Sequence, residues 1–239
     1  MKKENVYGSL GILPKEEMLE VKQDFQKLKI GIPKESSFQE NRIALTPDAV
    51  SLLVHNGHTI VIEHNAGVGA NFTDKEYSDA GAEIVFSIEE VYNTDIIIKI
   101  EPPTKTELKL LKKGQQLISA IQLHTRNKEY FQELLKKDIT SIAIEQIKDD
   151  EGKLTLLRSM SEIAGNTSLL IAAEYLSNVN SGKGLMLGSI TGIPPTDVVV
   201  IGAGTVGEFA SRTALGLGCN VRVFDSSLSK LRRLQQLTS

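Results

Sequence analysis

The sequence is poor in cysteine and has no hydrophobic run long enough to span a membrane. Its 239 residues contain one cysteine, Cys219, which excludes an internal disulfide framework and fits a reducing compartment. No run approaches the roughly 20 apolar residues that a transmembrane helix needs. The Lys- and Glu-rich N-terminus has no apolar core of the kind found in a secretory signal. We therefore expect a cytoplasmic protein.

Charge and composition exclude further classes of protein. The formal net charge of −3 indicates no basic surface for nucleic acid or an anionic membrane. With 41% hydrophobic and 24% charged residues, the chain has the composition of a globular protein of one large or two ordinary domains. His55, His58 and His64 lie close together, but no cysteine or acidic partner completes a metal set, and we expect no metal site. No P-loop or serine-hydrolase motif occurs.

Strand and helix patterns alternate from Leu28 onward. Apolar β-branched runs predict strands, and capped segments between them predict helices. The expected strands cover residues 28–32, 59–63, 83–86, 94–100, 116–121 and 140–144, and the expected helices cover 46–53, 73–81, 106–113 and 127–137. This alternation indicates an α/β fold with a mostly parallel sheet that has helices on both faces.

The chain divides into four expected segments. The first is an N-terminal extension with an amphipathic helix over residues 15–27, and the second is a substrate domain. Ser159 to Glu162 has capping-box spacing, which predicts that a connecting helix opens at Ser159. A dinucleotide-binding unit follows the helix and its loop. The boundaries are 1–27, 28–158, 159–196 and 197–239.

The last segment carries a glycine-rich turn. Val198 to Ile201 is a β-branched apolar run that predicts a strand covered on both faces, and Gly202, Gly204 and Gly207 follow at G-x-G-x-x-G spacing. The first glycine allows a tight strand-to-helix turn, the second lets a pyrophosphate approach the backbone, and the third allows close helix–strand packing. Free N–H groups at the helix start suit phosphates. The pattern predicts the start of a Rossmann domain.

An acidic residue lies where a ribose-binding carboxylate is expected. Asp225 ends a second β-rich run, 23 residues after Gly202, and no arginine stands beside it. A carboxylate accepts hydrogen bonds from both ribose hydroxyls and repels a 2′-phosphate, which favours NAD over NADP. The alternative is a turn that binds nothing, with Asp225 capping the next helix. Because a dinucleotide domain has two halves, we expect this one to continue beyond Ser239, and this chain alone to bind NAD weakly.

Several motifs together resemble a known family. The stretch IPKESSFQENRIALTP, from Ile32 to Pro47, is similar to the opening signature of the alanine dehydrogenase and nicotinamide nucleotide transhydrogenase N-terminal family. The run SMSEIAG from Ser159 to Gly165, the glycine turn and Asp225 continue in matching order. Within the family, Ser161 and the turn over 149–152 are more similar to alanine dehydrogenases than to transhydrogenase subunits.

The resemblance implies an NAD-dependent, homo-oligomeric enzyme that deaminates L-alanine to pyruvate and ammonium. A Cα hydride would pass to the nicotinamide, and water would hydrolyse the resulting imine. By resemblance, Arg42 is the clamp for the substrate carboxylate, a role that suits its bidentate fork. The alternative for Arg42 is a surface arginine that caps a turn. Ser161 and Lys230 are NAD contacts by resemblance, although each is also explained as an ordinary helix residue.

Two positions depart from the family pattern. The substrate-binding lysine of the family aligns with Glu101, and Lys99, on the same predicted strand face, is a candidate to replace it. A glutamate there repels a carboxylate substrate unless it is protonated or paired with Lys99. The acid/base histidine aligns with Gln122, and His124 is the candidate proton carrier. Our candidate catalytic residues are thus His124, Lys99 and Gln122, and our candidate substrate-binding residues are Arg42 and Glu101.

Three hypotheses for function remain. The first is an alanine dehydrogenase or close relative, with its substrate bound between two domains. The second is an NAD(H)-binding subunit of the transhydrogenase type, which passes hydride to a partner; Glu101 and Gln122 favour it because that branch also lacks the lysine and the histidine. The third is a family member that binds NAD without catalysis.

Overall fold

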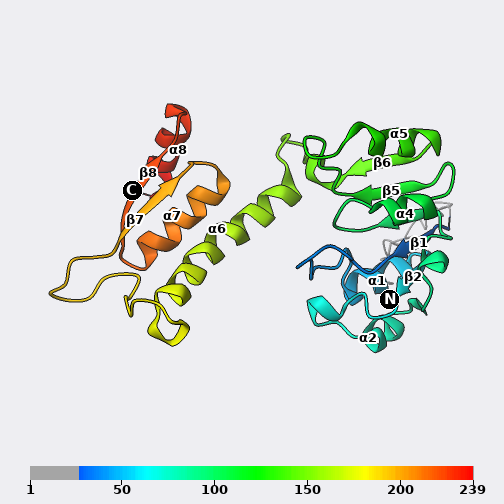
Figure 1. Cartoon of the computed structure of the whole chain (residues 1–239), viewed down its shortest axis with the longest axis horizontal. Coiled ribbons are helices and arrows are strands. Elements are labelled where there is room, and N and C mark those ends of the chain that lie inside the picture. Colours follow the sequence, from blue (N-terminus) through cyan, green and yellow to red (C-terminus); the bar gives the residue numbers. More distant parts are fainter. Residues whose placement is uncertain (1–26, 239) are drawn as a thin grey trace, which may run out of the picture.

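A computed structural model describes residues 27–238. The helix expected over residues 15–27 falls, apart from Lys27, outside this range. Figure 1 shows two lobes joined by one long helix, α6 (Thr155–Leu176). Within the described residues, no helix is both long and apolar enough to cross a membrane.

The larger lobe is built on a six-stranded sheet in which every neighbouring pair of strands is parallel. The strand order is β3-β2-β1-β4-β5-β6. The strands are β1 (Lys29–Ile32), β2 (Thr59–Glu63), β3 (Glu83–Val85), β4 (Ile96–Ile98), β5 (Gln116–Ser119) and β6 (Thr140–Ala143). All six expected strands are present, and the predicted α/β fold is confirmed.

Short capped helices connect these strands. They are α1 (Pro47–His55), α2 (Asp74–Asp79), α3 (Ile88–Val91), α4 (Lys105–Leu110) and α5 (Lys128–Lys136). Thr46 caps α1 as predicted, and its hydroxyl accepts a hydrogen bond from the Ala49 backbone N–H. Thr73 and Thr104 form complete capping boxes at α2 and α4. The sequence did not predict α3, because its four residues are too few to show a helical period.

Helices cover both faces of the sheet, as predicted. Val61 of β2 belongs to one apolar cluster, whereas its neighbours Ile60 and Ile62 belong to another. Alternate residues of a strand point to opposite faces, so the two clusters lie on opposite sides. The first cluster includes Leu108 of α4 and Leu134 of α5, and the second includes Val50 of α1 and Tyr77 of α2.

The strand order reverses between β1 and β4. In open parallel sheets, ligands bind outside the carboxyl ends of the strands at such a switch point. Arg42 follows β1, Glu101 follows β4 and Gln122 follows β5. The fold therefore places the segments that carry these candidate residues at one edge of the sheet.

The connecting helix begins earlier than predicted. It starts at Thr155, so the prediction that Ser159 is its N-cap was wrong. The Ser159 and Ser161 hydroxyls instead donate hydrogen bonds to the Thr155 and Leu157 carbonyl oxygens one turn back. Serine makes such bonds inside helices as well as at caps, and spacing alone does not separate the two.

The smaller lobe contains a βαβ unit that packs on α6. Strands β7 (Asp197–Ile201) and β8 (Asn220–Phe224) pair in parallel, with α7 (Thr205–Gly216) between them in sequence and α8 (Leu228–Thr238) after them. The glycine Gly165 brings α6 close to α7, because an added Cβ would lie 2.5 Å from the Val206 carbonyl oxygen.

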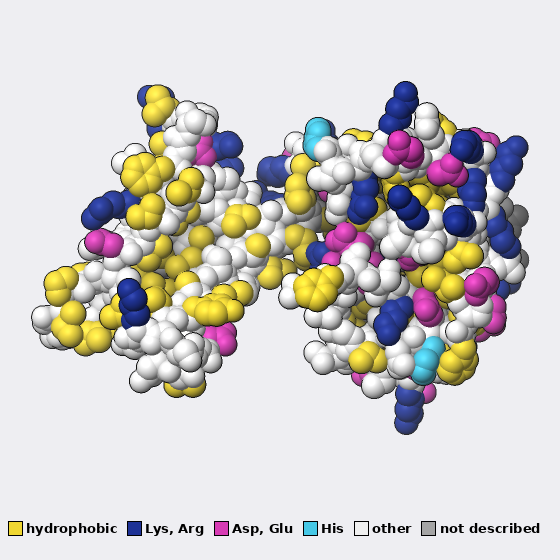
Figure 2. Space-filling model, in the orientation of Figure 1, with side chains coloured by type: hydrophobic (Ala, Val, Ile, Leu, Met, Phe, Trp, Pro, Cys, Tyr) yellow, Lys and Arg dark blue, Asp and Glu magenta, His cyan; other side chains and the backbone are white. Residues whose placement is uncertain are grey.

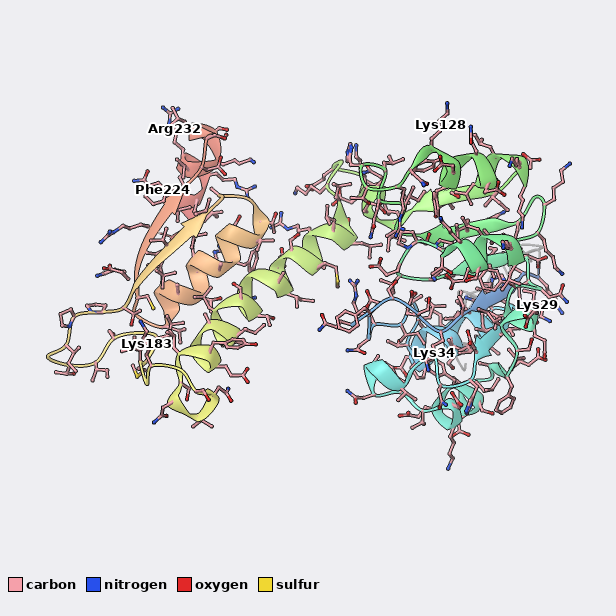
Figure 3. All side chains as sticks on the ribbon, viewed as in Figure 1. Lys29, Lys34, Lys128, Lys183, Phe224 and Arg232 are labelled. Carbon is pink, nitrogen blue, oxygen red and sulfur yellow. The ribbon has the colours of Figure 1, made fainter. Side chains whose placement is uncertain are left out.

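The prediction that this strand is covered on both faces was wrong for the described residues. The side chains of Val199, Ile201 and Phe224 are 56%, 88% and 58% exposed. Phe224 lies on the side of the strand pair away from α7 (Figure 3). Only the face toward α7 is covered, where Val198 and Val221 pack with Ala214. A continuous apolar run indicates burial without showing which segment supplies the second layer.

Candidate active site

A cavity of about 450 Å³ lies at the carboxyl edge of the sheet, and Arg42, Glu101, Gln122 and His124 all line it. Four of the five candidate catalytic and substrate-binding residues are thus brought together from three separate loops. Glu145 also lines the cavity, from the single-turn helix η2 (Ile144–Gln146) that follows β6. The start of α6 completes the wall with the apolar side chains of Leu156, Leu157 and Met160.

The guanidinium of Arg42 donates two hydrogen bonds to the carboxylate of Glu40. Its Nε lies 2.8 Å from Glu40 Oε1, and its Nη2 lies 2.5 Å from Glu40 Oε2. These hydrogen bonds lower the pKa of the Glu40 carboxyl and raise the pKa of Arg42. On the cavity side, Nη1 lies 3.4 Å from the Sδ atom of Met160. The Nε and Nη2 atoms of the guanidinium are therefore occupied by Glu40, and the Nη1 atom faces the cavity wall at Met160.

Glu101 and Gln122 touch each other. The Gln122 side-chain amide donates to Glu101 Oε2 at 3.2 Å, and the other carboxylate oxygen, Oε1, lies 4.0 Å from Arg42 Nη2. The Glu101 side chain is 24% exposed. A pairing of Glu101 with Lys99, one of the two conditions named for a glutamate at this position, is not found, because Lys99 pairs with Glu107 and Glu35. Glu101 faces Arg42 and Gln122 instead.

The backbone of Gln122 has an unusual conformation. Its φ of 51° lies in the left-handed region, which few residues other than glycine adopt. Glu145 holds this turn, because its Oε1 accepts the backbone N–H of Ile121 at 2.9 Å and that of Gln122 at 2.8 Å. Burial opposes the charge on Glu145, but these hydrogen bonds outweigh it and keep the pKa of the carboxyl below its usual value. Strained backbone of this kind is often found at functional sites.

His124 lies in the same turn, with an exposed side chain that lines the cavity. The turn is closed by a hydrogen bond from the Thr125 backbone N–H to the Gln122 carbonyl oxygen at 2.9 Å. His124 is therefore placed to reach a ligand in the cavity, and it stays a candidate proton carrier.

Lys99 does not line this cavity. Its side chain is 1% exposed, and its Nζ lies 2.8 Å from Glu107 Oε1 and 3.6 Å from Glu35 Oε2. Burial raises the pKa of Glu35, whereas at Glu107 burial is outweighed by the charge and hydrogen bond of Lys99, which leave that pKa lowered. The structure thus places Lys99 inside a buried ionic cluster and not beside Glu101.

The three glycines of the glycine-rich turn, Gly202, Gly204 and Gly207, have the geometry that their spacing predicts. Gly202 adopts a φ of 106°, and a Cβ added to Gly202 or Gly204 would meet no atom within 4 Å. A Cβ at Gly207 would lie 1.9 Å from the Gly202 carbonyl oxygen, so no other residue fits there without movement. The open space beside the first two glycines suits a close-lying phosphate.

Asp225 supports the glycine turn. Its Oδ2 accepts the Ala203 backbone N–H and its Oδ1 accepts the Ser227 N–H, each at 2.7 Å. These hydrogen bonds, with a smaller contribution from the charge of Lys230, lower the pKa of Asp225. The carboxylate has lone pairs left for ribose hydroxyls. Ser161 lies in the second turn of α6 and is half-buried, and Lys230 is exposed on α8.

Sequence reasoning missed three residues of the cavity network: Glu40, Glu145 and Arg126. Arg126 Nη2 lies 3.4 Å from Gln122 Oε1 and orients that amide. Glu145 was detectable in principle, since it follows a strand at the same sheet edge. Among the described residues, no group of three or more His, Cys, Asp or Glu side chains is placed to hold a metal ion.

Comparison with known families gives a direct assignment. The model described as the alanine dehydrogenase/PNT N-terminal domain matches residues 31–164, and that of the C-terminal domain matches residues 168–239. The chain belongs to the alanine dehydrogenase/PNT family. This confirms the resemblance carried by the IPKESSFQENRIALTP stretch and the glycine turn.

Individual relatives agree with the family. Alanine dehydrogenase 2 of Staphylococcus aureus and the alanine dehydrogenase of Staphylococcus epidermidis are each 40% identical over 211 residues, covering 88% of this chain and 56% of theirs. A solved L-alanine dehydrogenase superposes with a TM-score of 0.79 at 37% identity, covering 87% of this chain and 58% of that one. A transhydrogenase from Sinorhizobium meliloti gives 0.77 at 25% identity, covering 88% and 63%. The chain spans little more than half the length of these curated relatives.

Proposed function

We propose that this family member is an NAD-dependent alanine dehydrogenase, which converts L-alanine to pyruvate and ammonium. The six-stranded lobe would bind the substrate, and the βαβ unit would bind the pyrophosphate and a ribose of NAD. The observation that carries the proposal is the convergence of Arg42, Glu101, Gln122 and His124 on one cavity at the switch point of the sheet. The identity to alanine dehydrogenases supports the same reaction.

In this proposal each residue of the cavity has a separate role. Arg42 binds the substrate carboxylate, and Glu40 fixes the plane of its guanidinium. His124 takes the proton released when water adds to the imine carbon, since its exposed imidazole lines the cavity and can act as a general base. Leu156, Leu157 and Met160 form the apolar wall that keeps bulk water away. NAD, when bound, accepts the hydride from Cα.

The βαβ unit is consistent with NAD as the cofactor. Gly202 and Gly204 leave open space beside the turn, and Asp225 presents an ionised carboxylate close to it. That carboxylate would accept the ribose hydroxyls and repel a 2′-phosphate. Ser161 and Lys230 are proposed as further cofactor contacts.

An NAD(H)-binding subunit of the transhydrogenase type is the second candidate. Glu101 and Gln122 favour it, because they replace the residues on which amino-acid chemistry depends in the dehydrogenase branch, and the transhydrogenase from Sinorhizobium meliloti superposes nearly as well. A family member that binds NAD without catalysis is the third.

An NADH-oxidation assay with pyruvate and ammonium decides between these functions. We expect the full-length protein to consume NADH only when both co-substrates are present. Binding of NADH without turnover would contradict the dehydrogenase and favour the other two candidates.

Arg42→Lys is expected to raise the KM for pyruvate about tenfold, with a smaller effect on kcat. The lysine keeps the positive charge but loses the planar fork that meets a carboxylate with two hydrogen bonds. Steady-state kinetics with pyruvate and ammonium measure the change. Arg158→Lys is the matched control, since Arg158 pairs with Glu162 on the exposed side of α6. An unchanged KM in Arg42→Lys would remove Arg42 from the site.

We further propose that the protein is a cytoplasmic homo-oligomer. Large apolar side chains on α6 are exposed, including Ile163 at 58%, Leu170 at 59% and Tyr175 at 72%. Hydrophobic side chains gather over α6 on the face shown in Figure 2. Bare apolar surface of this kind marks association sites. Light scattering of the purified protein would show a mass above that of one chain, and a monomer would contradict the proposal.

A further inference from the structure

The cavity holds two opposite charges close together without joining them. Arg42 Nη2 and Glu101 Oε1 are 4.0 Å apart, which is too long for a hydrogen bond. Two groups free to move would close this gap, because a guanidinium and a carboxylate form short bidentate pairs. The reason that they stay apart lies in their other partners.

Each of the two charges is held by its own neighbour. Glu40 accepts hydrogen bonds of 2.8 and 2.5 Å from the Nε and Nη2 atoms of Arg42. The side-chain amide of Gln122 donates a hydrogen bond of 3.2 Å to Glu101 Oε2. Glu145 in turn fixes the left-handed backbone at Gln122 by accepting its N–H. Both charged side chains are therefore anchored on one side only.

The free sides of both groups are directed to the same space. The Nη1 atom of Arg42 has the thioether of Met160 at 3.4 Å, and a thioether is a weak acceptor that a carboxylate would readily displace. Glu101 Oε1 has its lone pairs open, with Arg42 beyond hydrogen-bond distance. The cavity thus offers the N–H donors of Arg42 Nη1 and the acceptor Glu101 Oε1 side by side.

We infer that Arg42 and Glu101 form a clamp for the zwitterion of a small α-amino acid, with the ammonium on Glu101 Oε1 and the carboxylate on the Nη1 end of Arg42. An α-amino acid carries its two charges on adjacent groups, in the same arrangement as the clamp. This inference rests on the proposed function only for the choice of L-alanine as the ligand to be tested. The clamp itself requires only that the ligand is an α-amino acid zwitterion.

A 2-oxo acid fits the same clamp poorly. Pyruvate carries a carboxylate and no ammonium, so it binds Arg42 but brings no cation to pair with the charge of Glu101 beside it. Glu145, whose pKa is lowered, adds a second negative charge to the wall, and Glu40 already neutralises much of Arg42. Lys99 is bound inside the lobe to Glu107 and supplies no second cation here. Glu101 is therefore a specificity-determining residue that favours the amino acid over the oxo acid.

Calorimetric titration of the full-length protein tests the clamp. L-alanine, L-lactate and pyruvate are titrated with saturating NADH and no ammonium, so that none of them is turned over. L-lactate has the shape of alanine with a hydroxyl in place of the ammonium, and it isolates the contribution of that charge. We expect alanine to bind at least tenfold more tightly than either anion.

The Glu101→Gln variant should remove this preference. The amide keeps the size of the side chain and loses its charge, so alanine should bind about tenfold more weakly and the two anions should bind as well as before or better. Glu129→Gln is the matched control, because Glu129 is an exposed acid on α5 and its loss changes the net charge equally. Thermal melts of both variants show whether the fold is kept.

The outcomes separate the clamp from the proposed function. Alanine preference that disappears in Glu101→Gln supports the clamp even if the NADH-oxidation assay shows no turnover, in which case only the dehydrogenase proposal fails. If the protein turns over pyruvate but binds lactate or pyruvate as tightly as alanine, the clamp is overturned and the dehydrogenase stands. Binding of none of the three ligands, or an unchanged preference in Glu101→Gln, also overturns the clamp.

Discussion

Gly207→Ala is expected to lower the free energy of unfolding by about 3 kcal/mol, at the upper end of what overpacking costs, and to abolish NADH binding. The added Cβ would lie 1.9 Å from the Gly202 carbonyl oxygen, which is a backbone atom and has no rotamer to adopt. Helix α7 is also in close contact with α6 at Gly165, so a shift of α7 disturbs a second tight interface. Urea unfolding measures the first effect, and calorimetry with NADH measures the second.

Gly216→Ala is the control for this substitution. It lies on the same helix, and an added Cβ there would meet no atom within 4 Å, so we expect little change in stability. Gly204→Ala separates folding from binding, because its Cβ also meets nothing in the protein but would enter the space beside the turn. It should fold and bind NADH more weakly. A Gly207→Ala variant as stable as the wild type would show that α7 adapts, and would contradict the packing role of this glycine.

The strands of the large lobe were predictable because local signals agree with the fold there. β2 has the predicted bounds, since Thr59 to Glu63 is a β-branched run between a glycine turn and a polar loop. α1 begins at Pro47 as expected, because threonine followed by proline fixes both the cap and the first turn. Two features were not predictable. The start of α6 was wrong because the spacing of Ser159 and Glu162 does not separate a cap from a helix interior. The cover of β7 depends on segments that are distant in the sequence.

The candidate site was predictable only in part. The loops after parallel strands meet at one edge of the sheet, so the meeting of Arg42, Glu101, Gln122 and His124 follows from their positions after strands. Lys99 failed this reasoning because β4 ends at Ile98. Past the end of a strand the alternation of faces need not continue, so Lys99 and Glu101 need not point the same way. The partners of Lys99 are Glu107 on helix α4 and Glu35 in the loop after β1, and no local pattern shows that these side chains meet.

Lys99→Met is expected to destabilise the large lobe by about 3–5 kcal/mol, the cost of removing one partner from a buried ion pair. The methionine fills the same volume but leaves Glu107 and Glu35 buried near each other without a cation. The cluster also fixes the end of β4, since Glu35 Oε1 accepts the Ile100 backbone N–H at 2.5 Å. Urea unfolding at neutral pH measures the change. Lys109→Met, an exposed lysine on α4, is the control of equal charge.

The destabilisation by Lys99→Met should depend on pH. In the wild type the pKa of Glu107 is lowered, so its contribution to stability is present above the ordinary glutamate pKa of about 4.3 and is lost as the pH falls through the lower folded value. In the variant the cation is absent and protonated carboxyls are favoured, so its stability rises relative to the wild type in acid.

The double variant Lys99→Met with Glu107→Gln tests the same point at neutral pH. We expect it to recover part of the loss, because the glutamine still accepts the Thr104 backbone N–H that now bonds Glu107 Oε2 at 2.6 Å. If Lys99 instead binds substrate, Lys99→Met would keep its stability at every pH and lose only its affinity for the ligand. That outcome would show that Lys99 belongs to the active site, and it would contradict the interpretation that Lys99 is buried to form the ionic cluster.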